Sequence, residues 1–281
     1  MLGASSSMFQ SLLARPEFVQ PGDVLHLYSR RRILAPTPMG VPKIATYALM
    51  DFAEASLEFD EIHNFIGTGD PRISRDELRR LSVSSLQWDS VATDRLRQGQ
   101  AGKYFSISSG VASDSYGSLE VNLYRDLKVE LEKRHEASSL PIVDIRVFGF
   151  ADSKSKFFGG SLVGDIRAAM TSQRPMITDA SDPIRDYCGA QELASLIAAI
   201  RANDQAVGIS ELHSLKPVSK RELLSFLSSS GIISISKSTG ILSTSTGSKP
   251  TYVPNDYKNL WGYKPTRSSF QVVCSALELE G

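Results

Sequence analysis

The sequence has few cysteines, no excess of charge of either sign and no long apolar run, and each absence excludes a class of protein. Two cysteines, Cys188 and Cys274, are too few for a disulfide framework, so we expect a reduced, cytoplasmic protein. Lys plus Arg and Asp plus Glu number 31 each, so no overall field would attract nucleic acid or an anionic membrane. We therefore expect neither as a partner, and any anionic ligand must be held by a local site.

Membrane segments and metal-ligand patterns are also missing. No run of about 18 apolar residues is present, so nothing in the sequence is expected to span a bilayer. The first residues lack the basic and apolar regions of a signal peptide. The four histidines are scattered without the spacing of metal ligands, so we expect no metal site at His26, His63, His135 or His213.

What the sequence does contain is an alternation of strand and helix patterns in its first half. Hydrophobic residues make up 41% of the 281 positions, enough for a large core. Strand-like runs at 23–28, 45–50, 59–67, 103–109 and 141–148 alternate with helix-like runs at 8–14, 84–96 and 121–133. This alternation predicts an α/β fold with a doubly wound parallel sheet over residues 1–150. Ligands of such folds bind beyond the carboxyl ends of the strands.

The alternation loosens after about residue 150. Helical patterns appear at 157–170 and 191–201, and a capping-box pattern at Ser219 opens a third that reaches Leu227. Residues 228–249 are rich in Ser, Thr and Gly and predict loop and weak strand. We expect residues 151–281 to add helices that cover the sheet and a smaller C-terminal lobe.

Tyr124 and Lys128 are the central candidate for chemistry. They are four residues apart, which places them on one face of the predicted helix. An ammonium near a phenol favours the phenolate, so Tyr124 could exchange a proton with a substrate while a nicotinamide exchanges hydride. The alternative is a solvated helix face. Ser108 and Ser109 end the preceding strand, where a hydroxyl could bond the same substrate oxygen; the alternative there is a polar turn.

Taken in order along the chain, these features resemble the extended branch of the short-chain dehydrogenase/reductase superfamily. The strand-end serines, the Tyr124-x-x-x-Lys128 helix and the strand at 144–148 are similar to that superfamily's core. Three further features resemble the nucleotide-sugar branch of that superfamily. They are Arg185-Asp186-Tyr187 before a helix, the turn at 260–265 (Leu-Trp-Gly-Tyr-Lys-Pro) and the strand at 59–67. The resemblance implies a Rossmann-like fold with a small substrate-binding lobe.

The resemblance also implies roles for individual residues. Ser109, or Ser108 one position earlier, would orient the substrate oxygen, and Tyr124 would be the acid/base. Lys128 would bind the nicotinamide ribose and lower the pKa of Tyr124. Arg185 would contact the diphosphate of a sugar nucleotide, for which a guanidinium is suited; the alternative is an ordinary surface arginine.

The cofactor end departs from the family pattern. The family's first turn has three glycines, and here only Gly3 remains, with Ser6 and Phe9 at the other two positions. Phe9 should push the first helix away from the strand or fill part of the cofactor cleft. Only Met1 and Leu2 precede the turn, so we expect a truncated start or a divergent cofactor site. Asn64 falls where the family lines the cofactor cleft.

Two further departures concern the substrate. Gly149 stands where an Asn usually touches substrate, and no Asp-Glu pair follows Ser109, which disfavours a dehydratase. The cofactor is expected to be NADP or NAD. Arg30 and Arg31 close the second strand, and arginines there accommodate a 2′-phosphate, so NADP is favoured; the alternative is a solvated basic loop.

The resemblance therefore predicts an NAD(P)-dependent epimerase or reductase, an oxidoreductase or isomerase that acts on a nucleotide sugar. By family analogy its place would be polysaccharide or glycan synthesis, and a homodimer is compatible with it. The alternative is a catalytically silent Rossmann-type module that binds a nucleotide or a protein. The degraded glycine turn favours that alternative, and the intact Tyr124 and Lys128 oppose it.

Overall fold

The computed structural model describes residues 1–30, 43–67, 74–113, 123–154, 161–237, 251–254 and 261–279. The parallel strands that form the main sheet are β1 (Val24–Ser29), β2 (Lys43–Ala48), β3 (Phe59–Asn64), β4 (Ala101–Ser109), β5 (Ile142–Val147) and β8 (Gly208–Leu212). β3, β4, β5 and β8 pair directly in that order, and β1 pairs with β2.

The two halves of the sheet are joined by the first residues of the chain. Leu2 forms parallel bridges with Tyr28 of β1 on one side and with Asn64 of β3 on the other. Its N–H donates to the carbonyl of His63, and its carbonyl accepts from Phe65. The order across the sheet is therefore β2, β1, Leu2, β3, β4, β5, β8, which is the strand order of a Rossmann fold when Met1-Leu2 is counted as the first strand. The prediction of a Rossmann-like α/β fold is confirmed.

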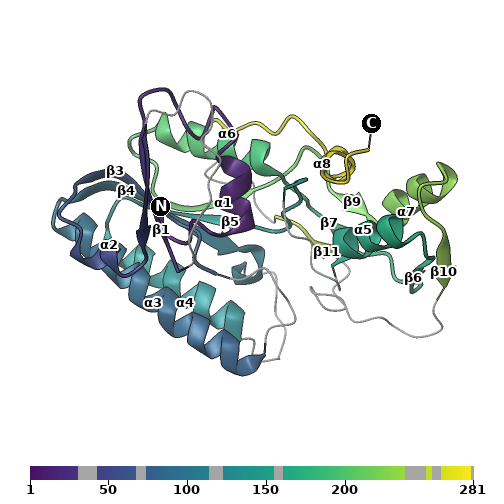
Figure 1. Ribbon diagram of the computed structural model, residues 1–281, viewed down its shortest axis with the longest axis horizontal. Coiled ribbons are helices and arrows are strands. Elements are labelled where there is room, and N and C mark those ends of the chain that lie inside the picture. Colours follow the sequence, from purple (N-terminus) through teal and green to yellow (C-terminus); the bar gives the residue numbers. More distant parts are fainter. Residues whose placement is uncertain are drawn as a thin grey trace.

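Helices cover both faces of this sheet (Figure 1). On one face lie α1 (Ser7–Leu12) and α6 (Ala190–Arg201), and on the other lie α3 (Arg75–Arg97) and α4 (Leu123–Ser138). The short helix α2 (Asp51–Glu54) follows β2. The α6 face encloses a core that includes Leu27, Phe105, Ile145 and Leu193. The α3 face encloses a second core around Trp88 and Tyr104.

The remaining elements form a smaller assembly beside the carboxyl ends of the strands (Figure 1). Its helices are α5 (Leu162–Ser172), α7 (Lys220–Ser229) and α8 (Ser269–Ala276). Its short strands are β6 (Met176–Thr178), β7 (Ile184–Arg185), β9 (Val218–Ser219), β10 (Ile235–Lys237) and β11 (Thr251–Tyr252). A separate apolar cluster, with members from Ala151 to Leu277, holds these helices together. The boundary at residue 150 stays a prediction. Beyond it, β8 pairs into the main sheet and α6 covers one face of that sheet.

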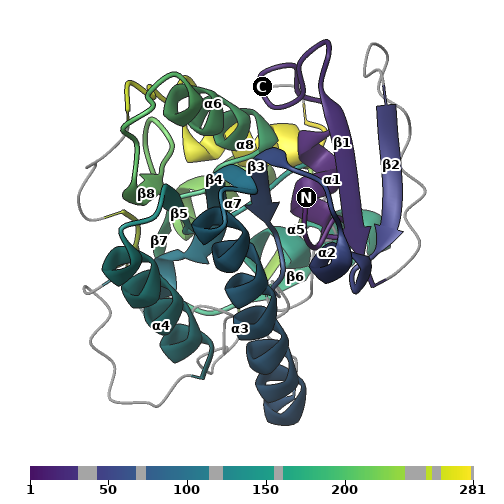
Figure 2. The same ribbon diagram turned by 90° about the vertical axis from the view of Figure 1, so that its left-hand side faces the viewer.

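The helices differ most from the expected ones at α3 and α8. α3 begins nine residues before the expected start at 84, because Ser74 and Glu77 form a capping box there. Its added turns extend past the sheet (Figure 2). α8 was not expected from the sequence, although Ser268 and Gln271 form a capping box at its start as well. No helix in the described part of the chain is long and apolar enough to cross a membrane.

Candidate functional site

The glycine turn lies where the order of the strands reverses. Gly3 has a φ of +69°, and a Cβ on it would lie 2.8 Å from the backbone nitrogen of Ile66 and 2.8 Å from the carbonyl carbon of Phe65. Only glycine fits both the backbone conformation and this close approach. The turn and the residues that follow β3 therefore meet at the carboxyl edge, in the position where doubly wound sheets bind dinucleotides.

Ser6 and Phe9 stand in place of the other two glycines and have different structural roles. Ser6 is the N-cap of α1, and its Oγ accepts a hydrogen bond of 3.2 Å from the N–H of Phe9. The Phe9 ring is fully buried, 6.2 Å from the ring of Phe18 and 5.4 Å from that of Phe65. The ring thus packs in the apolar core on the α6 side of the sheet, and α1 has only six residues.

The two candidate serines face different surroundings. Ser108 is buried, and its Oγ donates to Glu132 of α4 over 2.5 Å. Glu132 also pairs with Arg146, whose guanidinium reaches Glu211 and the carbonyl of Ala112. Ser109 is half-buried at the end of β4, and its Oγ caps the 3₁₀ turn η1 (Gly110–Ala112) by accepting from Val111. Of the two, Ser109 is the one at the carboxyl end of β4 whose hydroxyl is not bonded to a buried carboxylate.

Tyr124 and Lys128 lie on one side of α4, as expected. The Lys128 Nζ is 5.8 Å from the centre of the Tyr124 ring and donates 2.7 Å to the carbonyl of Ile107, two residues before Ser109. Lys128 is 4% exposed, so its charge acts on its neighbours with little screening by water. This bond fixes the start of α4 against the end of β4, and so relates Tyr124 to Ser109.

A second tyrosine, which sequence reasoning missed, joins this group. The Tyr252 hydroxyl is 3.5 Å from the Ser109 Oγ, and its ring lies 5.3 Å from that of Phe148. Burial raises the pKa of Tyr252, and Tyr124 and Arg185 lie close enough for their charges to act on it. Tyr252 lies in a segment with no distinct pattern, at the end of a Ser/Thr/Gly-rich stretch, so no local signal marked it.

Arg185 is brought to the same place by strand pairing. It is the residue opposite Tyr252 in the β7–β11 pair, and it is buried. Its Nη1 donates to the carbonyl of Ile184. The site thus combines Ser109 from the sheet, Tyr124 from α4, and Arg185 and Tyr252 from the smaller assembly.

Two glycines beside this group have no room for a side chain. A Cβ on Gly110 would overlap the Phe148 ring. A Cβ on Gly149 would lie 2.6 Å from the carbonyl oxygen of Asp186 and 2.8 Å from the Tyr187 ring. The family's Asn could not occupy position 149 in this backbone, so its absence and the close packing of residues 186–187 are linked.

The other predicted cofactor residues lie in different settings. Asn64 is buried at the end of β3, beside Leu2. Arg30 is exposed immediately after β1, which ends at the buried Ser29. Arg31 lies outside the described residues.

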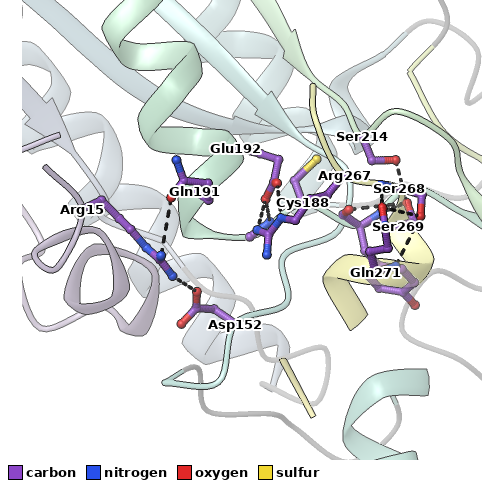
Figure 3. Close-up of polar contacts among 12 residues, drawn as sticks. Arg15, Asp152, Cys188, Gln191, Glu192, Ser214, Arg267, Ser268, Ser269 and Gln271 are labelled. Atoms are coloured by element: carbon purple, nitrogen blue, oxygen red, sulfur yellow. Dashed lines mark hydrogen bonds and ion pairs between the residues drawn. The ribbon is translucent and has the colours of Figure 1, made fainter. Parts of the chain in front are cut away.

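Polar contacts tie the smaller assembly to the sheet next to this site (Figure 3). Glu192 of α6 accepts two hydrogen bonds of 2.8 Å from Arg267. Asp186 accepts from the N–H of Ser214 at 2.9 Å and from the hydroxyl of Ser269. Burial raises the pKa of Asp186, against the opposing effect of its bonds from Ser214. The Asp186 bonds hold the segment that carries Arg185 near the end of β8, and the Glu192–Arg267 pair holds the start of α8 against α6.

Comparison with known proteins gives similarity in structure only. No family model matches the sequence, and no curated protein matches it. Solved structures do match over nearly the whole chain. They include WbmG of Bordetella bronchiseptica in complex with NAD and UDP (TM-score 0.75, 12% identity, 99% of this chain and 91% of that one).

Two other solved structures match equally well. One is the UDP-glucuronic acid 4-epimerase of Bacillus cereus with UDP-glucuronic acid and NAD (TM-score 0.73, 13% identity, 99% and 96% covered). Another is DesIV, a dTDP-glucose 4,6-dehydratase of Streptomyces venezuelae, as a double mutant with NAD bound (TM-score 0.75, 15% identity, 99% and 94% covered). The chain therefore has the fold of NAD-dependent nucleotide-sugar epimerases and dehydratases, and the predicted resemblance is confirmed at the level of the fold.

Proposed function

We propose that this protein is an NAD(P)-dependent epimerase or reductase that acts on a nucleotide-activated sugar. The observation that supports the proposal is the position of Lys128: its Nζ is 5.8 Å from the centre of the Tyr124 ring and donates to the carbonyl of Ile107 near the end of β4, the strand that ends at Ser109. The carboxyl ends of the strands are where Rossmann-type sheets bind their ligands. Solved structures with the same fold are epimerases and dehydratases of nucleotide sugars.

In the proposed mechanism Tyr124 moves the proton. As phenolate it would accept the proton of a sugar hydroxyl, with Ser109 donating a hydrogen bond to the same oxygen. The Lys128 Nζ is 5.8 Å from the centre of the Tyr124 ring, on the same side of α4. A bound nicotinamide supplies the hydride transfer. In the return step Tyr124 gives the proton back, so an epimerisation is redox-neutral overall and a reduction consumes one hydride and one proton.

The cofactor fits the geometry at the glycine turn. A Cβ on Gly3 would lie 2.8 Å from the chain after β3, so only glycine allows the two backbone segments to come this close. The turn lies at the point where the strand order reverses. The named solved structures contain NAD, so we propose NAD, held by residues near Gly3 and Asn64. NADP is the second candidate, because the exposed Arg30 directly follows β1, and an arginine at this position can accommodate a 2′-phosphate.

The substrate class follows from Arg185 and from the bound groups of those structures. A buried guanidinium beside the tyrosine pair suits an anionic diphosphate. UDP and UDP-glucuronic acid occupy two of the solved structures with this fold. We therefore propose a uridine or thymidine diphosphate sugar.

The test is turnover of a panel of UDP- and dTDP-hexoses with NAD⁺ and with NADP⁺, followed by Tyr124→Phe on the substrate found. Loss of the acid/base should lower kcat by roughly 100-fold or more, with an unchanged melting temperature. Tyr47→Phe, at a half-exposed tyrosine on the edge strand β2, is the matched control. Near-normal turnover in a folded Tyr124→Phe protein would contradict the assignment.

A silent dinucleotide-binding module is the second candidate, and the glycine turn favours it. Phe9 and Ser6 replace two glycines, and the Ser6 hydroxyl accepts from the N–H of Phe9, one of the N–H groups in the first turn of α1. Mass spectrometry of small molecules released from the freshly purified, denatured protein shows whether a dinucleotide is bound, and the turnover panel then distinguishes the two candidates. A silent module would release dinucleotide yet turn over no sugar nucleotide in the panel.

A further inference from the structure

A buried ion cluster joins the two helices on the α3 face to the sheet. His135 of α4 lies between two carboxylates: its Nδ1 is 2.9 Å from Asp144 of β5, and its Nε2 is 2.8 Å from Asp89 of α3. The three side chains are at most 4% exposed. Polar groups buried this deeply are not hydrated, so each needs a hydrogen-bond partner among its neighbours.

The histidine in this cluster is an imidazolium at neutral pH. Burial alone would lower the pKa of His135, but its hydrogen bonds to Asp144 and Asp89 outweigh burial and raise the pKa to about 10. Both ring nitrogens therefore donate, and Asp89 and Asp144 both accept. The Asp89 carboxylate is thus held in one place with one lone pair directed at His135.

From Asp89 a directed chain of hydrogen bonds runs to the end of β3. The Tyr104 hydroxyl donates 2.9 Å to Asp89, because a carboxylate can only accept. The same hydroxyl oxygen must then accept, and it does so from the Asn64 Nδ2 at 2.8 Å. This fixes which way the Asn64 amide points: its nitrogen faces Tyr104, and its oxygen accepts from the N–H of Ile66 at 2.9 Å.

Asn64 in turn holds the turn that meets the glycine of the first loop. The Asn64–Ile66 bond closes the backbone directly after β3. It is the nitrogen of Ile66 that a Cβ on Gly3 would approach to 2.8 Å. Leu2 is bridged to Asn64 from the other side. One amide therefore sets the spacing between the two backbone segments that form the edge at the reversal of strand order.

We infer that Asp89, His135, Asp144 and Tyr104 are positioning residues for the dinucleotide cleft, and that they act through the amide of Asn64. The cleft as a dinucleotide site rests on the proposed function; the positioning of the turn after β3 does not. None of these four side chains would touch the cofactor, since they lie between the sheet and the helices α3 and α4.

The experiment is Tyr104→Phe, which keeps the ring and removes the hydroxyl that links Asp89 to Asn64. The matched control is Tyr263→Phe, since the Tyr263 hydroxyl is also buried and donates 2.8 Å to the carbonyl of His213. Hydrogen exchange of residues 64–67 is read by mass spectrometry. We expect exchange there to be at least 10-fold faster in Tyr104→Phe and in Asn64→Ala, and unchanged in Tyr263→Phe.

The second measurement is the dissociation constant for NAD⁺. Tyr104→Phe should weaken binding about 5- to 30-fold, and the Tyr104→Phe/Asn64→Ala double variant should be no weaker than Asn64→Ala, because the first acts through the second. A merely structural role would lower the melting temperature and leave both readouts unchanged. If Tyr104→Phe does not fold, Asp89→Asn tests the same link. An amide at position 89 can donate as well as accept, so the Tyr104 hydroxyl is no longer required to donate to it.

Each outcome decides one part. Unchanged exchange at 64–67 overturns the positioning of the turn. Faster exchange with unchanged NAD⁺ affinity overturns its effect on the cleft. If the wild type binds neither NAD⁺ nor NADP⁺, the proposed function fails, and the exchange measurement still decides the positioning.

Discussion

Ser108 and Ser109 are consecutive residues whose side chains serve different purposes. Side chains alternate along a strand, so the two hydroxyls lie on opposite faces of the sheet, and that of Ser108 is on the α4 side. Ser108 donates to Glu132, which also neutralises Arg146. Ser109 lies beside Tyr252. We therefore assign the proposed chemical role to Ser109 and not to Ser108.

We predict opposite effects for the two alanine variants. Ser109→Ala should lower kcat by roughly 10² without loss of stability, since a donor to the reacting oxygen is removed. Ser108→Ala should lower the free energy of unfolding by about 1–3 kcal/mol, because it takes away a partner of a buried carboxylate. Steady-state kinetics and urea unfolding of both variants check this. Equal kinetic effects would show that the serines are not divided in this way.

His135 makes the stability of the protein depend on pH. Its pKa is raised to about 10 in the folded state, from 6.5 as a free side chain. The stabilisation is therefore fully present below about pH 6.5 and is lost as the pH rises toward 10. His135→Gln should lose on the order of 3 kcal/mol at pH 6, as expected when a buried ion pair is broken, and less at pH 9.5. Thermal unfolding of both proteins from pH 6 to pH 10 measures the gap, and a gap that widens with pH would contradict the assignment.

At the scale of elements, α4 has a buried polar stripe. Lys128, Glu132 and His135 follow helical spacing and are all buried, each bonded to β4 or β5: Lys128 to a backbone carbonyl, Glu132 to Ser108 and Arg146, and His135 to Asp144. From the sequence alone, a stripe of polar residues on a helix predicts a solvent-exposed helix face. Its residues are buried because the strands beneath it supply matching partners, and a single sequence does not say which distant residues those are.

The helix α1 depends on one aromatic ring. It has six residues, too few to be stable by itself, and Phe9 is the buried residue that packs against both Phe18 and Phe65. Phe9→Ala should therefore cost about 3–5 kcal/mol, measured by chemical unfolding. Restoring the family's glycine at this position should likewise destabilise the protein. A variant as stable as the wild type would mean that α1 is not held by this ring.

At the scale of the whole molecule, the smaller assembly is tied to the sheet by an ion pair. Glu192 of α6 is 1% exposed, and its partner Arg267 lies just before α8. Arg267→Met would leave a buried carboxylate without its cation and should cost about 3 kcal/mol. Adding Glu192→Gln should recover much of that loss, because the amide can still accept from the N–H of Gly189. Thermal unfolding of the two single variants and the double variant completes the cycle; additive losses would show that the two residues are not coupled.

The sequence by itself determined the order of the main elements, because hydrophobic periodicity and capping residues act over a few neighbouring positions. It therefore predicted the parallel sheet, the helix that carries Tyr124 and Lys128, and the serine pair. The tertiary structure decided which serine bonds a buried carboxylate, that Tyr252 joins the group through its pairing with Arg185, and that Phe9 packs in the core. It also decided that His135 is a buried ion rather than a scattered surface histidine. These features depend on contacts between residues 9 to 143 positions apart, and no local pattern in one sequence specifies which distant side chains will meet.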